Sequence, residues 1–151
     1  MTEIKLTADE LQMISLFQNV SSAMARDCII DEKQGRLIFV VEKGQMGLAI
    51  GKNGSTIKAL QSVMGKKVEL VEFSEEPTIF IKNSLGLYVQ DVKINETSHG
   101  KVAIVVVDPT KKGIVVGKDG KNAEKARILA KRYFDVTNVL IVSPEQVRSD
   151  L

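Results

Sequence analysis

The sequence predicts an α+β fold made of two tandem domains, each a small three-stranded mixed sheet with helices packed on one face. Two observations predict it. A G-x-x-G turn occurs twice, and each copy follows an apolar strand pattern and precedes an amphipathic helical pattern. When the chain is aligned with itself so that Gly51 falls on Gly117, the strand-like runs LIFVVE and AIVVVD also coincide. A repeat that carries both turns and strands indicates two copies of one domain.

We expect the first domain over residues 1–74 and the second over residues 75–151. The boundary lies in the stretch SEEPT (74–78), where charged residues and Pro77 interrupt the apolar periodicity. Domains of this size are close to the lower limit for an independent hydrophobic core.

The first domain begins with a helix and a hairpin. Thr7, with Glu10 three residues later, is a capping-box signal, and a helical apolar stripe follows it. Residues 27–31 and 36–42 read as two strands joined by the turn EKQG. A short apolar helix over 46–50 leads into the glycine turn, and Ser55 is expected to cap the helix behind it. That helix ends at Gly65, and residues 66–73 close the domain as a strand.

The second domain repeats this order. Residues 78–86 fit a helix and a strand equally well, and both assignments stay open. Residues 88–94 and 101–108 read as strands. Asp108 and Pro109 begin a turn into a short helix, and an amphipathic helix follows the second glycine turn as far as Tyr133. Residues 138–142 are the closing strand.

The composition excludes several classes of function. Hydrophobic residues make up 44% and charged residues 26%, as in ordinary globular domains, and no apolar run is long enough for a membrane helix. The N-terminus lacks the apolar stretch of a secretion signal, so we expect a cytoplasmic protein without a membrane partner. Cys28 and His99 are single residues of their kind, so we expect no disulfide and no metal site. Without a Ser-His-Asp set or paired carboxylates, we expect no enzyme, cofactor or small-molecule substrate.

The glycine turns do not match nucleotide-binding loops. A P-loop needs a longer interval between its glycines and a hydroxyl after the lysine, where this chain has Asn53 and Asp119. The repeated unit is G-x-x-G between two helices, with a lysine at its second position. Such a turn lets a sugar-phosphate backbone approach the N-terminus of the following helix.

A purely steric role for the glycines is the alternative for either copy alone. The repetition favours a functional role, and so does Lys121, a cation at a helix N-terminus that a bound phosphate would stabilise. Basic residues also cluster around the second turn: Lys111, Lys112, Lys118, Lys121, Lys125, Arg127, Lys131 and Arg132.

The two turns, GKNGSTI and GKDGKN, with the apolar triplets LAI and IVV before them, resemble tandem type II KH domains. Residues 5–145 are similar to the paired KH domains of the NusA transcription factors, and the small size is similar to the archaeal NusA-like proteins. The resemblance implies binding of single-stranded RNA in transcription elongation and termination. The RNA-binding residues that it implies are Ile50, Gly51, Lys52, Asn53, Gly54, Ser55 and Ile57 in the first domain, and Val116, Gly117, Lys118, Asp119, Gly120 and Lys121, flanked by Ala123, in the second.

The resemblance also implies details of the site and its partners. The edge facing the bases is expected from strands near 28–30 and 92–94. Asp119 puts a carboxylate where phosphate passes, so we expect the second turn to bind more weakly than the first. Aromatic residues make up only 5% of the chain, so base stacking is not expected to be the main source of affinity. Bacterial NusA carries an N-terminal polymerase-binding domain and an S1 domain, for which this chain has no room. The resemblance implies RNA polymerase as a partner, and because these domains are missing the contact is expected either directly or through another factor.

Two other functions fit the same sequence. One is a ribosomal-RNA-binding or ribosome-assembly KH protein. The other is a protein-interaction scaffold whose turns bind no RNA.

Overall fold

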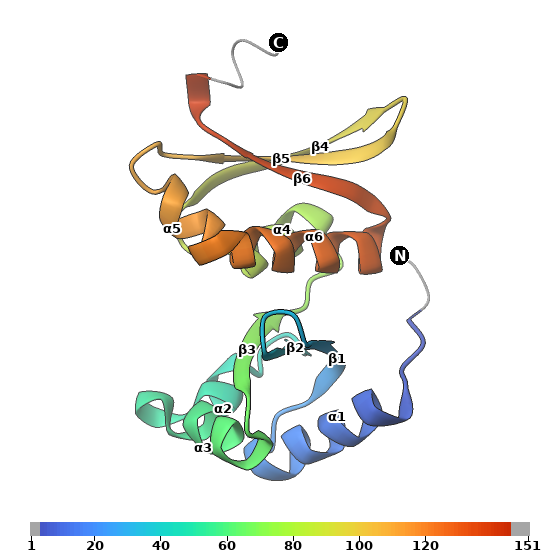
Figure 1. Cartoon of the computed structure of the whole chain (residues 1–151), viewed down its shortest axis with the longest axis vertical. Coiled ribbons are helices and arrows are strands. Elements are labelled where there is room, and N and C mark those ends of the chain that lie inside the picture. Colours follow the sequence, from blue (N-terminus) through green and yellow to red (C-terminus); the bar gives the residue numbers. More distant parts are fainter. Residues whose placement is uncertain (1–3, 146–151) are drawn as a thin grey trace. The chain divides into compact units, whose positions relative to one another are not determined.

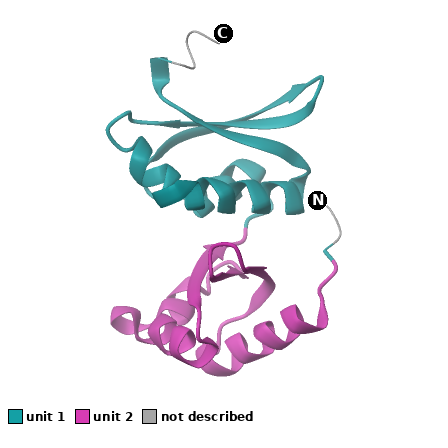
Figure 2. Cartoon of the chain, viewed as in Figure 1, with its two compact units in different colours: residues 1–4, 74–151 teal, residues 5–73 magenta. Residues whose placement is uncertain are grey.

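A computed structural model describes residues 4–145 as two compact units (Figures 1 and 2). Lys5–Phe73 form one unit, magenta in Figure 2, which we call the first domain. Residues 74–145 belong to the other, drawn in teal, which we call the second domain. The division of the whole chain into residues 1–74 and 75–151 stays a prediction.

The first domain has the predicted order of elements. These are α1 (Ala8–Ser21), β1 (Ala25–Asp31), β2 (Arg36–Val41), α2 (Met46–Ile50), a single 3₁₀ turn (Lys52–Gly54), α3 (Ser55–Met64) and β3 (Lys67–Glu72). β2 is central, antiparallel to β1 and parallel to β3, so the sheet is mixed as predicted. The three helices contribute to one core with the sheet, whose buried members are Ile14, Phe17, Ala23, Ala25, Cys28, Leu37, Phe39, Val41, Ala49, Leu60 and Val68.

The capping box at the start of α1 is confirmed. The Thr7 hydroxyl accepts a hydrogen bond from the Glu10 N–H at 3.2 Å, and the Thr7 N–H donates to the Glu10 carboxylate at 2.7 Å. Further along α1, the ring of Phe17 stacks on Phe39 of β2 with centroids 4.6 Å apart. The cap therefore begins a helix whose buried face is anchored to the central strand.

The second domain repeats the same order. Its elements are α4 (Pro77–Leu85), β4 (Val89–Thr97), β5 (Gly100–Val107), α5 (Lys112–Val116), a 3₁₀ turn (Lys118–Gly120), α6 (Lys121–Phe134) and β6 (Val136–Val142). β5 is central, antiparallel to β4 and parallel to β6. The α+β fold class, with a three-stranded mixed sheet in each domain, is confirmed.

Residues 78–85 of the ambiguous segment 78–86 belong to a helix, α4, and Gly86 is its C-cap. Pro77 occupies its first turn, where a missing N–H costs nothing. The buried residues follow helical spacing: Phe80, Ile81, Ser84 and Leu85. Among residues 4–145, no helix has both the length and the hydropathy needed to cross a membrane.

Candidate nucleic-acid interface

The two glycine turns have the same backbone conformation. Gly51 has φ 75° and ψ 171°, and Gly117 has φ 82° and ψ 165°. At the third position Asn53 has φ 55° and Asp119 has φ 55°, both in the left-handed region. In each turn the fourth-position N–H donates to the carbonyl of the first glycine, at 3.1 Å in the first domain and 3.0 Å in the second. The repeat seen in the sequence is therefore a repeat of backbone geometry.

The first glycine of each turn has a steric reason. A Cβ on Gly51 would lie 2.7 Å from the backbone nitrogen of Thr56, in the first turn of α3. A Cβ on Gly117 would lie 2.8 Å from the side-chain nitrogen of Asn122 in α6. At Gly51 the backbone of the following helix leaves no room for a Cβ, and at Gly117 the Asn122 side chain would have to move. The first glycine therefore has the steric role that the sequence left open.

The second glycine of each turn has a different reason. Gly54 and Gly120 have φ 74° and 72°, and each is the N-cap of the following helix. A Cβ on Gly54 would only touch Ile57 at 3.8 Å, and one on Gly120 would meet nothing within 4 Å. These glycines adopt the left-handed backbone at little cost. They also leave open space at the helix N-terminus.

Asn53 and Asp119 are explained by the backbone as well. Asparagine and aspartate adopt left-handed φ more readily than other residues with a side chain. The sequence alone indicated only the charge of Asp119, and this backbone reason was not predicted. The available signal was the Asn or Asp directly before a glycine.

The helices after the turns begin without a side-chain cap. Ser55 is the first residue of α3, with helical φ and ψ of −61° and −40°, and the N-cap is Gly54, which has no side chain to donate or accept. The prediction that Ser55 caps α3 is therefore wrong, because the helix starts one residue earlier than that role requires. Lys121 is the first residue of α6, at the N-terminus as predicted.

The apolar triplets before the turns divide between core and surface. Ala49 and Val115 are buried and anchor α2 and α5. The residue directly before each of them is exposed to solvent: the exposed fraction is 53% for Leu48 and 56% for Ile114. Ile50 and Val116 are the predicted groove residues, and the exposed pair Leu48 and Ile114 is not among the predicted residues. The available signal was the position of Leu48 and Ile114, each two residues before a predicted groove residue and separated from it by a single core residue.

The other predicted residues separate in the same way. Lys52, Asn53, Ser55, Lys118 and Asp119 are exposed. Ile57 is half-buried against the core of the first domain. Ala123 is 2% exposed, so its predicted place beside the groove is wrong; it lies on the buried face of α6.

The helices on either side of each turn contact the last strand of their sheet. α2 and α3 contact β3, and α5 and α6 contact β6, whereas β1 lies at the opposite edge of its sheet and contacts α1. Cys28 of β1 is fully buried. The parallel crossover from β2 to β3 carries both helices toward β3, away from the edge near 28–30 and 92–94 that was predicted to face the bases.

A hydrogen-bonded turn fixes the start of α5. The Asp108 carboxylate accepts from the N–H and the hydroxyl of Thr110, at 2.8 Å and 2.7 Å, and the Lys111 N–H donates to the Asp108 carbonyl at 2.8 Å. The hydroxyl and then the N–H of Thr110 lower the pKa of Asp108 below its ordinary value, and the charge of Lys111 acts in the same direction. The carboxylate thus stays ionised and holds this turn at neutral pH.

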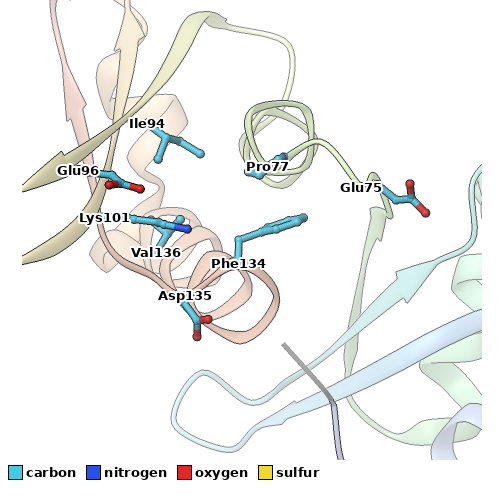
Figure 3. A pocket seen from close by; sticks show the side chains of 8 residues that line it. All are labelled: Glu75, Pro77, Ile94, Glu96, Lys101, Phe134, Asp135 and Val136. Carbon is cyan, nitrogen blue, oxygen red and sulfur yellow. The ribbon is translucent and has the colours of Figure 1, made fainter. Parts of the chain in front are cut away.

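A pocket of about 600 Å³ in the second domain is separate from the turn (Figure 3). Its lining includes Phe134 and Asp135, at the C-terminal end of α6, with Ile94 and Pro77. The glycine turn is at the other end of this helix, about 21 Å away for a helix of this length. In the described part of the chain, no three His, Cys, Asp or Glu side chains are grouped as metal ligands would be.

Comparisons with known proteins match this geometry. The KH domain family matches the chain twice, over residues 12–84 and 75–143. The chain is 37% identical over 139 residues to the "Probable transcription termination protein NusA" of Halobacterium salinarum, covering 90% of this chain and 96% of that one. The protein of the same name from Methanocaldococcus jannaschii is 30% identical over 147 residues, covering 97% and 79%. A solved structure, the "Crystal structure of APE1850", superposes with a TM-score of 0.82 at 36% identity over 91% of this chain and 100% of that one. The chain therefore belongs to the NusA-like family of tandem KH-domain proteins represented in archaea.

Proposed function

We propose that this protein binds single-stranded RNA in transcription elongation and termination, and that its two G-x-x-G turns clamp the RNA backbone. The observation that carries the proposal is the duplicated geometry. Each turn combines an exposed lysine, an open second glycine and a helix N-terminus without a side-chain cap. In KH modules the G-x-x-G loop clamps four backbone nucleotides.

The chemistry of each turn suits a phosphate. The N-terminus of a helix carries backbone N–H groups and the positive end of the helix dipole, both of which favour an anion. Lys52 and Lys118 add a charge at the turn itself. Because Gly54 and Gly120 have no side chain, a phosphodiester can approach these N–H groups closely.

The bases of the bound strand would lie against the apolar side of the turn. Leu48 and Ile50 are exposed beside the first turn, and Ile114 is exposed beside the second. β3 and β6, the strands that contact the turn helices, would form the other wall. Apolar contacts there suit bases without requiring aromatic residues.

The transcription context rests on the relatives, which are named transcription termination proteins. RNA polymerase is the proposed protein partner, reached directly or through another factor. The ribosomal alternative has no comparable support among these relatives.

The test is an anisotropy titration of the full chain against a labelled single-stranded RNA and the same RNA as a duplex. We expect preference for the single strand, and a fall in log affinity against log salt of about 0.7 per phosphate neutralised. Lys52→Asp/Asn53→Asp should lose at least about 10-fold in affinity, because two carboxylates then face the phosphate. Asp119 already adopts the same left-handed φ, so the change at Asn53 should leave the fold intact.

The matched control is Lys33→Asp/Gln34→Asp in the β1–β2 turn, which makes the same change of charge away from the glycine turn. It should bind RNA within about 2-fold of the wild type, since only distant, screened charges change. If the wild type binds no RNA, or if Lys52→Asp/Asn53→Asp binds RNA as well as the wild type and the control do, the scaffold function replaces this proposal.

A further inference from the structure

One aromatic ring in this chain is on the surface. The chain has five phenylalanines, two tyrosines and no tryptophan. Phe17, Phe39, Phe73, Phe80 and Tyr133 are buried and Phe134 is half-buried, whereas Tyr88 is 46% exposed. Leu87, directly before it, is 95% exposed. A single exposed leucine is ordinary, but the pair puts the exposed aromatic ring beside a second large apolar side chain.

Tyr88 contacts Lys111, the residue before the short helix that leads to the second glycine turn. It directly precedes β4, whose first residue, Val89, pairs with Val107 at the end of β5. The chain then makes the Asp108 turn and enters α5. The Lys111 amine lies 4.9 Å from the centre of the Tyr88 ring. From there α5 runs for five residues to the glycine turn, a rise of about 7.5 Å.

We propose that Tyr88, with Lys111 against its ring, is a stacking platform for one nucleobase of the RNA strand held by the second G-x-x-G turn. The inference rests on the proposed function and extends its binding surface beyond the turn. An aromatic face and an adjacent cation match the two parts of a nucleotide, the base and the phosphate. The hydrogen-bonded turn of Asp108 and Thr110 supplies the rigidity, because it fixes the backbone of Lys111.

The corresponding position of the first domain lacks this chemistry. Ala25 pairs with Val41 as Val89 pairs with Val107, so Met24 corresponds to Tyr88. Met24 is 51% exposed, and its N–H donates to the Gln45 side chain at 2.7 Å. Gln45, the N-cap of α2, stands where Lys111 is the N-cap of α5. The first domain therefore has an apolar side chain without a ring or a cation. The platform adds affinity to the domain whose turn carries Asp119.

The two tyrosines make a direct test possible. Tyr133 is 1% exposed, and without tryptophan the intrinsic emission comes from Tyr133 and Tyr88 alone. Single-stranded RNA is titrated into the full chain while tyrosine emission is recorded, and binding is followed in parallel by anisotropy of labelled RNA. Tyr88→Phe supplies the correction for absorption by RNA, because it keeps the ring but leaves only Tyr133 emitting.

We expect a saturable loss of tyrosine emission that follows the binding curve and is absent in Tyr88→Phe. Tyr88→Phe should bind RNA as the wild type does, and Tyr88→Ala should bind at least about 5-fold more weakly. Met24→Ala, the control in the first domain, should change affinity by less than about 2-fold, since no ring is lost there.

Two failures are distinguishable. If the wild type binds RNA while its tyrosine emission is unchanged and Tyr88→Ala binds normally, the platform is overturned and the proposed function stands. The exposed pair is then better explained as a protein contact. If the wild type shows no binding by anisotropy, the proposed function fails and the platform fails with it.

Discussion

The two G-x-x-G turns share one backbone and differ in the side chains that it carries. The first turn has the amide of Asn53 and the hydroxyl of Ser55, where the second has the carboxylate of Asp119 and the amine of Lys121. The φ angles at the first, third and fourth positions agree within a few degrees. The glycines and the left-handed third residue are therefore requirements of the backbone, whereas the charges are free to differ. Substitutions of the glycines therefore test folding, whereas substitutions of the charged residues test RNA binding.

The largest expected effect separates the two glycines of one turn. Gly51→Ala should cost about 3 kcal/mol of unfolding free energy, because it combines a forbidden backbone conformation with a contact against the Thr56 nitrogen. Gly54→Ala should cost about 1 kcal/mol, since only the left-handed φ is unfavourable. Urea unfolding at equilibrium measures both.

The second turn sharpens this prediction. The nearest obstacle to a Cβ on Gly117 is the end of the Asn122 side chain, which can move, and the backbone nitrogen of Asn122 is 3.1 Å away. Gly117→Ala should therefore destabilise the protein less than Gly51→Ala. Equal costs for Gly51→Ala and Gly54→Ala would contradict the steric account of the first glycine.

A smaller effect is expected from making the second turn like the first. Asp119→Asn should strengthen RNA binding about 2- to 5-fold, because it removes one carboxylate from the path of the phosphate. Stability should not change, since Asn53 has the same φ in the first turn. Asp135→Asn is the control: this residue is also left-handed, with φ 56°, but it lies at the C-terminal end of α6. A gain from Asp135→Asn as large as that from Asp119→Asn would mean that only net charge matters.

The smallest effect concerns the turn before α5. The pKa of Asp108 is lowered from an ordinary value of 3.8, so the folded state holds this proton less tightly than the unfolded chain. The stabilisation is therefore present above pH 3.8 and is lost as the pH falls below it, through the folded-state pKa. Asp108→Asn should lower the melting temperature slightly at pH 7 and leave it unchanged near pH 2. A melting-temperature difference that persists unchanged at pH 2 would argue against the ionised carboxylate as the cause.

Local patterns predicted most of the fold. The capping box, the hairpin of β1 and β2, the short helix at 46–50 and the helix–turn–helix repeat depend on neighbouring residues, and the structure confirms them. The segment that became α4 stayed ambiguous because it is short and its isoleucines and phenylalanine are common in strands. Its burial pattern depends on contacts with α6 and β4.

The candidate site was less predictable because it depends on tertiary geometry. The strands follow one another in the sheet as they do in the chain, but the strand patterns alone do not show which edge strand the two helices of each turn contact. Ala123 belongs to the apolar stripe of the α6 pattern, and only the resemblance placed it beside the groove. The apolar triplets alone do not show which of their members are buried, and only the orientation of α2 and α5 exposes Leu48 and Ile114. What the sequence identified correctly was the repeated turn itself.

The most direct test of the central claim compares four proteins on one single-stranded RNA: the wild type, Lys52→Asp/Asn53→Asp, Lys118→Asp, and the combination of both changes. If both turns hold RNA, each change weakens binding, and the first weakens it more because Asp119 already limits the second turn. The combined protein should lose nearly all binding, since neither turn then raises the local concentration of RNA for the other. Wild-type affinity in the combined protein, with an unchanged melting temperature, would contradict the account.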